Sequence, residues 1–540
     1  ARCNSVAARP VESHFGRSLG EGRVSDIATL VADNLETWTS AIEHKSNSGR
    51  GSSKKSDLYG IDRLRALILD LAIHGKLVGQ CENDQPAAEL LKLLPDEWPG
   101  VRRRKSKPKH STVKQIEFEL PHGWVAAPGT RIFGTRSGNS KLIKGKLHPE
   151  FREGLYPGFS ASGQDVWLDN FEHEGVAIIL SAVGARCGKA FLAQGHWSAI
   201  ANTHIIWMEP RVTLPDFAML VLNNEEYWER AGGAQPFVKV GNTLDKPFFL
   251  PPLAEQERIV AKVDELMALC DALERESEDA LAAHQTLVDT LLATLVNSTD
   301  AADLAKNWAR LEKHFDTVFT TSDSVEELKK TILDLAVSGK LLPTSQDPKA
   351  GKLSDLGDWA GGNGFPKKFQ GKAEGEVPFL KVSDMNLPGN ERQITCANNR
   401  VSSEEITEMR AKLHPPGTVI FPKIGGAIAT NKRRILVEPS AIDNNCAGQV
   451  PAAGIDTDWL YIVLSSIDMA IYQAGTSVPA VNMKRLANHS VTITDEGDQK
   501  RLVAEVDKLL KLCEQLKSHL ADATETQRHL ADAIVERAAA

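Results

Sequence analysis

Few residues of this chain have the types and spacing that enzymatic chemistry requires. The segment GARCGKA at 184–190 resembles a phosphate-binding loop, but it has one residue too few between its glycines and no Ser or Thr after Lys189. His173 lies between Glu172 and Glu174, yet no second histidine follows at helical spacing to complete a metal site. No Asn-Pro-Pro-Tyr or Asp-Pro-Pro-Tyr tetrapeptide of a methyltransferase and no recognisable Ser, His and Asp set occurs. We therefore expect no catalytic residue and no metal ligand.

The remaining chemistry is the binding of anions by clustered Lys and Arg. Residues 101–147 carry 12 basic side chains against 2 acidic ones, a net charge of +10, and residues 365–435 carry 12 against 7, a net of +5. Residues 253–316 have the opposite balance, with 14 acidic side chains against 6 basic ones, so the overall charge of −8 conceals a split. This split favours phosphate binding by two separate parts of the chain. The alternative for RRRKSKPKH at 102–110 is a solvated basic linker.

The composition limits the elements that can position such surfaces. The 540 residues are 42% hydrophobic and 25% charged, an ordinary globular composition that suggests roughly three or four folded units. Seven widely spaced cysteines without a CxxC pair argue against a disulfide scaffold or a zinc site and favour a reducing cytoplasm. No apolar run approaches the roughly 18–20 residues of a membrane span, and no secretory signal is recognisable. We expect a cytoplasmic protein that does not enter a membrane.

Two helical segments each occur twice in the chain. ILDLAIHGKLV at 68–78 returns as ILDLAVSGKLL at 332–342, and QERIVAKVDELMALCDALE at 256–274 returns as QKRLVAEVDKLLKLCEQLK at 499–517. The spacers that separate the short segment from the long one show no such likeness. A repeat of this length indicates a duplicated pair of domains rather than a solenoid.

The longer repeated segments have apolar residues at alternating spacings of three and four, which favours a coiled-coil seam. A helix over 255–295 would be about 60 Å long at 1.5 Å per residue. The alternative is an amphipathic helix packed on a core, but two equal helices in one chain favour mutual pairing. The predicted seam consists of Val263, Leu266, Cys270, Leu273, Ser277, Ala280, His284, Leu287 and Leu291, and of Val506, Leu509, Cys513, Leu516, Leu520, Ala523, Gln527, Leu530 and Ile534.

The shorter repeated segments predict helices that end at a glycine. Apolar residues at 64–72 and 328–336 have helical spacing, and Gly75 or Gly339 follows as a C-cap. The spacers are instead rich in Gly, Pro and Asn, with short runs such as GVAIILSAVG and GTVIFPKIGG that read as strands. They predict two compact mixed α/β units with irregular sheets.

These elements predict an α+β protein in which two mixed α/β domains are separated by two long helices, with an internal duplication and pseudo-twofold symmetry. The expected parts are an N-terminal extension and linker (1–58), the first short helical repeat with a basic linker (59–116), the first spacer domain (117–250), the first long helix (251–296), the second short helical repeat (297–356), the second spacer domain (357–492) and the second long helix (493–540).

Several of these segments resemble the specificity subunits of type I restriction-modification enzymes. PPLAEQERIVAKVDELMALCDALE at 251–274 resembles the family's exit from a target-recognition domain into its long helix. YGIDRLRALILDLAIHGKLVGQ at 59–80 and its central copy are also similar, as are LPHGWVAAP, ASGQDVWLDN, VPFLKVSDMN, VIFPKIGGAIATNKRRIL and AIDNNCAGQVP in the spacers. One departure is TITDEGDQKRLV at 492–503, which lacks the Pro-Pro-Leu of the first exit and places the second exit less securely.

The resemblance implies a non-catalytic subunit that recognises double-stranded DNA. Each spacer would be a target-recognition domain that reads half of a split sequence, and an antiparallel coiled coil would hold the two domains apart. Two modification subunits that carry S-adenosylmethionine and methylate adenine would bind the repeated helices. Separate restriction subunits would use ATP and magnesium, so this chain would bind no cofactor directly.

Base recognition needs paired donors and acceptors, Arg or Lys to guanine and Asn or Gln to adenine. In the first spacer domain we expect DNA contacts from Ser160, Ser162, Gln164, Arg186, Lys189, Asn202 and His204, with Lys141, Lys144 and Lys146 on phosphates. In the second we expect them from Lys381, Ser383, Asp384, Asn386, Lys423, Thr430, Asn431, Lys432, Arg433, Arg434, Asn444 and Asn445. The alternative for each Asn and Asp is a structural role in a turn. Residues 431–434 form the best cluster, and replacing its three cations with Ala is predicted to weaken DNA binding and flatten its salt dependence.

Two other classes of protein remain as alternatives at this stage. A coiled-coil scaffold could join two protein-binding domains, and the basic stretches beside base-reading residue types speak against it. A single-chain enzyme such as a nuclease is the third class, and the missing catalytic motifs argue against it. Composition and periodicity leave the DNA-recognition subunit and the coiled-coil scaffold nearly equal, and the family resemblance favours DNA recognition.

Overall fold

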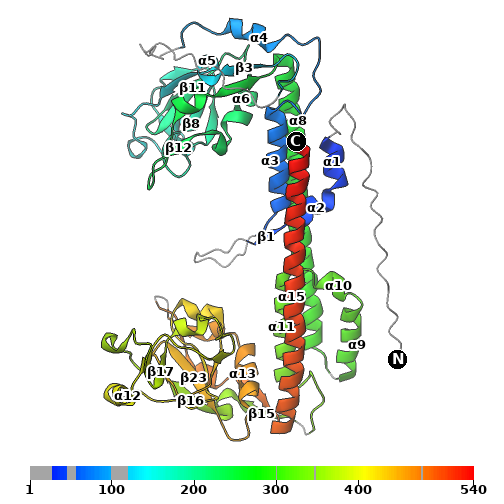
Figure 1. Cartoon of the computed structure of the whole chain (residues 1–540), viewed down its shortest axis with the longest axis vertical. Coiled ribbons are helices and arrows are strands. Elements are labelled where there is room, and N and C mark those ends of the chain that lie inside the picture. The colour runs from blue at the N-terminus through cyan, green and yellow to red at the C-terminus, as the bar shows by residue number, and fades with distance from the viewer. Residues whose placement is uncertain are drawn as a thin grey trace. The chain divides into compact units, whose positions relative to one another are not determined.

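The structure, a computed structural model, describes residues 27–44, 56–98, 119–299, 301–345, 348–475 and 478–539 (Figure 1). The basic run at 102–110 and most of the expected linker at 44–57 lie outside the described residues. The chain divides into two compact units, the first formed by Ala1–Ser277 with Thr524–Ala540 and the second by Glu278–Ala523. Both units combine helices with irregular sheets, so the protein is mixed α/β.

The two longest helices are α8 (Leu253–Val296) and α15 (Glu496–Ala539). They lie within the segments whose heptads predict long helices. Val263, Leu266, Cys270 and Leu273 are buried on α8, and Val506 and Cys513 are buried on α15.

The strict heptad is wrong further along both long helices. Leu287 is 50% exposed whereas Val288 is fully buried, and Leu530 is 46% exposed whereas Ala531 is fully buried. An α-helix has 3.6 residues per turn, so its buried face drifts by about 20° per heptad from a 3.5-residue repeat. The buried face therefore passes to the next residue at equivalent points of the two helices.

The short repeated helices are α3 (Tyr59–Ile73) in the first unit and α11 (Ser322–Val337) in the second. The expected glycine caps are confirmed, because Gly75 and Gly339 have positive φ angles of 69° and 72°. The N–H groups of Lys76 and Lys340 then donate to the carbonyls of Leu71 and Leu335, which closes each helix.

Each short helix lies along the start of a long helix (Figure 1). In the first unit, Arg65 of α3 contacts Asp271 and Glu274 of α8, both at 2.6 Å. In the second unit, Lys329 of α11 contacts Glu514 of α15 at 2.6 Å, and Lys517 of α15 contacts Glu326 of α11 at 2.5 Å. The repeated helices thus pack in the same way in the two units.

The first unit contains two four-stranded sheets. One has the order β4-β11-β8-β9 and the other β6-β5-β10-β7, in which β5 and β10 are parallel. Two-stranded ribbons are formed by β14 with β3 and by β12 with β13. The strands are β3 (Val125–Pro128), β4 (Gly134–Ser137), β5 (Tyr156–Ser160), β6 (Gly163–Leu168), β7 (His173–Glu174), β8 (Ala177–Ser181), β9 (Ala190–Ala193), β10 (His196–Ala199), β11 (Thr203–Trp207), β12 (Arg230–Ala231), β13 (Phe237–Val238) and β14 (Pro247–Leu250).

The second unit has a five-stranded sheet of order β16-β23-β20-β21-β18 and a three-stranded sheet of order β19-β17-β22, in which β17 and β22 are parallel. Its two-stranded ribbons are β15 with β26 and β24 with β25. The strands are β15 (Lys349–Lys352), β16 (Gly357–Gly361), β17 (Val377–Leu380), β18 (Gln393–Ile394), β19 (Arg400–Val401), β20 (Val419–Pro422), β21 (Arg434–Leu436), β22 (Ala441–Ile442), β23 (Cys446–Pro451), β24 (Gln473–Ala474), β25 (Ala480–Val481) and β26 (Ser490–Ile493).

The two sheet systems share one pairing pattern, although their sequences show no clear likeness. The order β4-β11-β8-β9 corresponds to β16-β23-β20-β21, and the parallel pair β5 and β10 corresponds to β17 and β22. Helix α6 (Pro215–Leu222) packs on β8 and β9, and α13 (Thr457–Ser466) packs on β20 and β21 in the equivalent position. The duplication therefore extends to the spacers.

The remaining elements are short and connect these layers. In the first unit they are α1 (Ile27–Asp33), α2 (Leu35–Ser40), β1 (Glu43–His44), β2 (Ser56–Asp57), α4 (Ala87–Leu90), η1 (Leu91–Leu93), α5 (Gly129–Ile132), η2 (Lys144–Lys146), η3 (Glu225–Tyr227) and α7 (Val240–Leu244). In the second unit they are α9 (Ala301–Glu312), α10 (Phe315–Val318), η4 (Leu353–Leu356), η5 (Lys367–Phe369), η6 (Val382–Asn386), α12 (Ser403–Met409), η7 (Gly426–Thr430), η8 (Met469–Tyr472) and α14 (Met483–Ala487).

A buried glutamine fixes the start of each long helix. The Gln256 side chain accepts from the backbone N–H of Leu214 at 2.7 Å and donates to the carbonyls of Val212 and Pro251. Leu214 is the N-cap residue of α6, so Gln256 ties α8 to the helix that covers the sheet.

Gln499 makes the equivalent contacts in the second unit. Its side chain accepts from Asp456, the N-cap residue of α13, at 2.8 Å and donates to the carbonyls of Gly454 and Thr494. The second exit therefore has the geometry of the first without Pro-Pro-Leu, because Thr494 supplies the carbonyl that Pro251 supplies in the first.

Replacing Gln256 with Leu is expected to destabilise the first unit by about 2–3 kcal/mol, because it leaves three backbone groups without partners, two of them in buried hydrogen bonds. The measurement is the midpoint of urea unfolding. Gln194→Leu, at an exposed turn of the same unit, is the matched control and should leave the midpoint unchanged. Equal midpoints for the two variants would contradict the role assigned to Gln256.

Candidate nucleic-acid interface

The loops that carry the predicted residues of the first unit meet at one end of its sheets. The N–H of Asn139 donates to the carbonyl of Ala199 at 2.8 Å, and the N–H of Ile200 donates to Phe159 at 3.0 Å. The N–H of Ala182 donates to the carbonyl of Asn202 at 2.9 Å. These bonds join the loops at 138–147, 160–164, 182–189 and 200–203 into one surface, which we call the first loop edge.

Most predicted residues of the first loop edge point to solvent. The exposed side chains are Lys141, Lys144, Lys146, Ser162, Gln164, Arg186 and Asn202, and Lys189 is half-buried. Lys144 forms an ion pair with Asp165. Asn202 has a φ angle of 68°, so it also serves the turn before β11, as the structural alternative for asparagine predicts.

Two predicted residues of the first loop edge have internal roles. Ser160 is buried, and its hydroxyl accepts from the N–H of Ser162 at 3.0 Å. His204 is half-buried on β11, between Ser137 and Leu180 of the neighbouring strands. Burial lowers the pKa of His204, so its imidazole is neutral at pH 7.

The second unit has an equivalent surface, the second loop edge, formed by residues 381–386, 423–432 and 443–445. The N–H of Asp443 donates to the carbonyl of Leu380, and the N–H of Lys423 donates to Asn445 at 2.7 Å. The Lys432 ammonium group contacts the side-chain oxygen of Asn386. Ser383, Asn386, Thr430 and Asn444 are exposed, and Lys381, Lys423, Lys432 and Asn445 are half-buried.

Arg433 and Arg434 do not reach this surface, which corrects the expectation that they contact DNA. They are 2% and 9% exposed. The Arg433 guanidinium donates to the carbonyls of Leu464 and Ile467, at 2.9 and 3.0 Å. Arg434 donates to the carbonyl of Met385 at 2.7 Å. Each arginine would have to break these hydrogen bonds to contact a phosphate. A buried carbonyl left without a donor costs free energy.

Three other predicted residues of the second unit are held by local contacts. Asp384 is fully buried and accepts from the N–H groups of Lys381 and Asn398, both at 2.7 Å. The Asn431 side chain accepts from the N–H of Met469 at 3.2 Å, and its φ angle is 48°. The Lys381 ammonium donates to the side chain of Gln370 at 2.6 Å.

Sequence reasoning missed the two hairpins that border the loop edges. The N–H of Gly184 donates to the carbonyl of Pro236 beside β13, and that of Gly425 donates to Pro479 beside β25, both at 2.8 Å. The only local signal is a Gly and a Pro at each hairpin tip, which marks a turn without indicating what lies beside it.

Lys423 and Lys432 are two of the cations that remain at the second loop edge after Arg433 and Arg434 are excluded; the third, Lys381, donates to Gln370. Replacing both with Ala is expected to weaken DNA binding and to lower the slope of log affinity against log salt by about 2, because each contact releases about one counterion. Binding titrations at several salt concentrations measure the slope. Lys349→Ala, on β15 at the opposite end of the sheets, is the control. An unchanged slope in the double variant would remove the two lysines from the interface.

Among the described residues, no helix is long and apolar enough to span a membrane. The same residues contain no group of three or more His, Cys, Asp and Glu side chains that could hold a metal ion.

Curated relatives match the chain over nearly its full length. The specificity subunit of the type I restriction enzyme EcoAI from Escherichia coli is 30% identical over 594 aligned residues, which cover 95% of this chain and 99% of the relative. The EcoEI specificity subunit from the same organism is 30% identical over 602 residues with the same coverage. The chain is therefore a component of type I restriction systems. Within that class, it belongs to the family of specificity subunits.

Other comparisons give weaker matches. The EcoprrI specificity subunit of Escherichia coli is 25% identical over 121 residues, or 22% of this chain and 30% of the relative. A chain from a structure of complex assembly in the type I R-M system is 16% identical, with a TM-score of 0.49 over 78% of this chain and 99% of that one. The HsdS subunit from Thermoanaerobacter tengcongensis is also 16% identical, with a TM-score of 0.39 over 78% and 98%. No family model matches.

Proposed function

We propose that this chain is the DNA-recognition subunit of its complex and catalyses nothing alone. Each loop edge would read one half of a bipartite target in double-stranded DNA. The observation that carries the proposal is the pair of equivalent loop edges, where lysines lie beside amide and hydroxyl side chains; the lysines are mostly exposed at the first edge and half-buried at the second. Lysines suit phosphates, and the polar side chains suit base edges. Because the side chains at the two edges differ, the two half-sites would differ as well.

The long helices would act as the spacer between the half-sites. We propose that α8 and α15 pair as an antiparallel coiled coil that holds two target-recognition domains apart. In the first unit, the start of α8 and the end of α15 both contact α3, through Asp271 and Asp532. In the second unit, the end of α8 and the start of α15 share one core, through Val288 and Val506. These contacts support opposite directions for the two helices.

The catalytic functions would belong to partner subunits. Two modification subunits with S-adenosylmethionine would methylate adenine within the target, and restriction subunits would use ATP and magnesium. We propose that the modification subunits bind the repeated helices.

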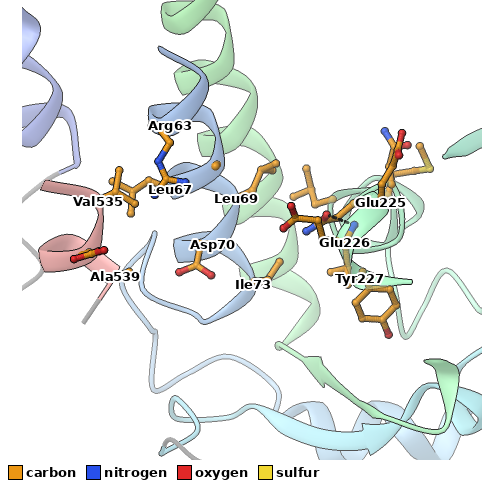
Figure 2. Close-up of a pocket in the computed structure, with 17 residues that line it drawn as sticks. Arg63, Leu67, Leu69, Asp70, Ile73, Glu225, Glu226, Tyr227, Val535 and Ala539 are labelled. Carbon is orange, nitrogen blue, oxygen red and sulfur yellow. Dashed lines mark hydrogen bonds between the residues drawn. The ribbon is translucent and has the colours of Figure 1, made fainter. Parts of the chain in front are cut away.

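A groove in the first unit is a candidate docking surface for one modification subunit (Figure 2). Its cavity has a volume of about 790 Å³ and is bounded by α3, by residues 219–227 and by the end of α15. Its apolar lining consists of Ala66, Leu67, Leu69, Ile73, Met219, Leu220, Val221, Val535 and Ala539.

Four carboxylates surround the apolar lining of this groove, and they favour a cationic occupant. They belong to Asp70, Glu225, Glu226 and Glu536, against the single lining cation of Arg63. Arg63 is already paired with Asp532 at 2.8 Å and Glu225 with Arg230 at 2.5 Å, so the other three carboxylates carry the excess negative charge. We therefore propose that the modification subunit inserts an amphipathic helix with basic residues beside its apolar face.

Replacing Leu69 with Lys is expected to weaken binding of the modification subunit by about tenfold or more, because the change removes apolar contact and adds a like charge. Titration of the purified modification subunit against the full chain measures the affinity. Leu93→Lys, at a leucine that is 41% exposed elsewhere in the first unit, is the control. Equal affinity of the two variants would place the docking surface elsewhere.

The proposed function as a whole is tested by mapping methylated adenines genome-wide in the source cell, with and without this gene. The expected result is loss of a two-part motif with a fixed internal gap. Loss of a continuous motif would contradict the two-half-site proposal. If no methylation changes, co-purification with the products of neighbouring genes decides whether the chain has modification partners.

A further inference from the structure

Two hairpins occupy the same place in the two units. The first joins β12 to β13 and the second joins β24 to β25. The N–H of Val238 donates to the carbonyl of Ala182, and that of Val481 donates to the carbonyl of Lys423, both at 2.9 Å. With the glycine N–H bonds described above, each hairpin is thus fixed by two backbone hydrogen bonds to the basic loop that follows the central strand.

The first hairpin exposes a large apolar side chain, because Phe237 is 43% exposed. Its neighbour Val238 serves the core and is 6% exposed. Phe237 is therefore held at the surface, where packing of the unit does not require its size. The equivalent place of the second hairpin is occupied by Ala480, between Pro479 and Val481, which make the same backbone hydrogen bonds as Pro236 and Val238.

The ring of Phe237 has a defined position on its hairpin. A Cβ atom added to Gly232 would lie 3.2 Å from the ring and 2.7 Å from the carbonyl oxygen of Gln235. Gly232 also has a φ angle of 91°, which favours glycine. The turn thus accommodates the ring against its own backbone, which limits the conformational entropy that the ring would lose on binding.

The loop beside the first hairpin carries two cations, Arg186 and Lys189. The hairpin's own Arg230 is paired with Glu225 at 2.5 Å. A protein that binds an apolar side chain ordinarily presents an apolar surface. Here the neighbouring side chains are cations and amides, which suit a nucleic acid. Duplex DNA offers both chemistries, because its phosphates attract the cations and its base steps accept an apolar wedge.

We propose that the first hairpin is a wedge and that Phe237 enters a base step of the first half-site. The proposal rests on the proposed function, and it assigns this hairpin to DNA distortion rather than to hydrogen-bonded base reading. Insertion partly unstacks the step, and sequence selectivity then arises from how readily a given step unstacks.

The test locates the base step that is unstacked on binding by placing a mismatch at each position of the target. Duplexes carry the mapped motif with one mismatched pair at each successive position, and the full chain is titrated with each. A mismatch at the wedged step removes the unstacking cost in advance, so binding should tighten there. Phe237→Ala should lose this gain in the first half-site and bind the matched target about tenfold more weakly, in the range measured for base stacking. Phe237→Trp should keep the gain.

Two controls separate a wedge from a structural role. Phe171→Ala removes a phenylalanine that is 39% exposed in the same unit, beside His196 at the start of β10 and so away from the first loop edge, and it should behave as wild type. Val478→Ala, in the hairpin of the other unit, should leave the mismatch response of the first half-site unchanged.

If Phe237→Ala binds every duplex as wild type does, the wedge proposal is overturned. If wild type does not prefer the mapped motif over unrelated DNA, the proposed function itself has failed, which is a different result.

Discussion

Inserting one heptad into each long helix is expected to lengthen the unread gap between the half-sites by up to about three base pairs. Seven helical residues add about 10 Å at 1.5 Å per residue. The duplex rises about 3.4 Å per base pair, so this length corresponds to about three. The insertions belong after Ser277 in α8 and after Ala523 in α15.

These positions leave the packing of both units intact. The first unit ends on α8 at Ser277 and resumes on α15 at Thr524, so the insertions fall between the units along the chain. The buried residues Cys270 and Ala531 stay with the first unit, and Val288 and Cys513 stay with the second. A whole heptad also preserves the facing of a 3.5-residue seam, which a shorter insertion would rotate.

The methylation map of cells that express the double-insertion variant measures the new gap. Insertion into α8 alone is the control, because it offsets the proposed pairing partners and should abolish recognition. If the double-insertion variant methylates a motif with the original gap, the helices do not set the spacing.

The helical parts of this fold could be predicted because their signals are local. Apolar periodicity indicated the long helices, and Gly75 and Gly339 marked the ends of the short ones. The point at which the buried face shifts from Leu287 to Val288 could not be predicted. The apolar face of an α-helix rotates away from a 3.5-residue repeat, and the residue at which burial changes depends on the neighbouring elements that pack there. The repeated Gln256 and Gln499 were visible in the sequence, but their backbone partners lie 42 and 43 residues away.

The likeness of the two spacers was invisible in the sequence because it consists of backbone pairings. Asn202 and Asn445 precede equivalent strands, β11 and β23, yet Ile206 on the first corresponds to Gln449 on the second. Similar backbone paths can thus carry different side chains, which explains why the candidate residues could be assigned to loops while their burial could not. Asp384 and Asn386 lie two residues apart, and one is fully buried whereas the other is exposed.

Arg433 shows this limit most sharply, because a run of three cations reads as a solvated or DNA-binding surface. Its guanidinium instead caps the C-terminus of α13, where the carbonyls of Leu464 and Ile467 lack helical partners. In the first unit the equivalent carbonyl, that of Leu222 on α6, accepts from the Trp228 indole at 2.8 Å. The equivalent helix ends of the two units are therefore capped by different residues. Neither cap could be predicted from the few residues around it.

Replacing Arg433 with Met is accordingly expected to destabilise the second unit by about 3 kcal/mol or more. The change strands two buried carbonyls at the helix end, and each costs about 1–3 kcal/mol. It also removes the favourable position of a cation at the negative end of the helix dipole. The guanidinium lies 5.5 Å from the centre of the Phe421 ring, and that contact is lost as well.

Single substitutions separate folding from DNA binding within this run. Arg433→Met should lower the urea midpoint of the second unit, whereas Lys432→Met should leave the midpoint unchanged and weaken DNA binding, because Lys432 lies at the second loop edge beside Asn386. The triple alanine variant combines both effects, so weak binding by it would not by itself show a phosphate contact. The opposite pattern, in which Arg433→Met keeps wild-type stability and loses DNA affinity, would restore Arg433 to the interface and require its guanidinium to leave α13 when DNA binds.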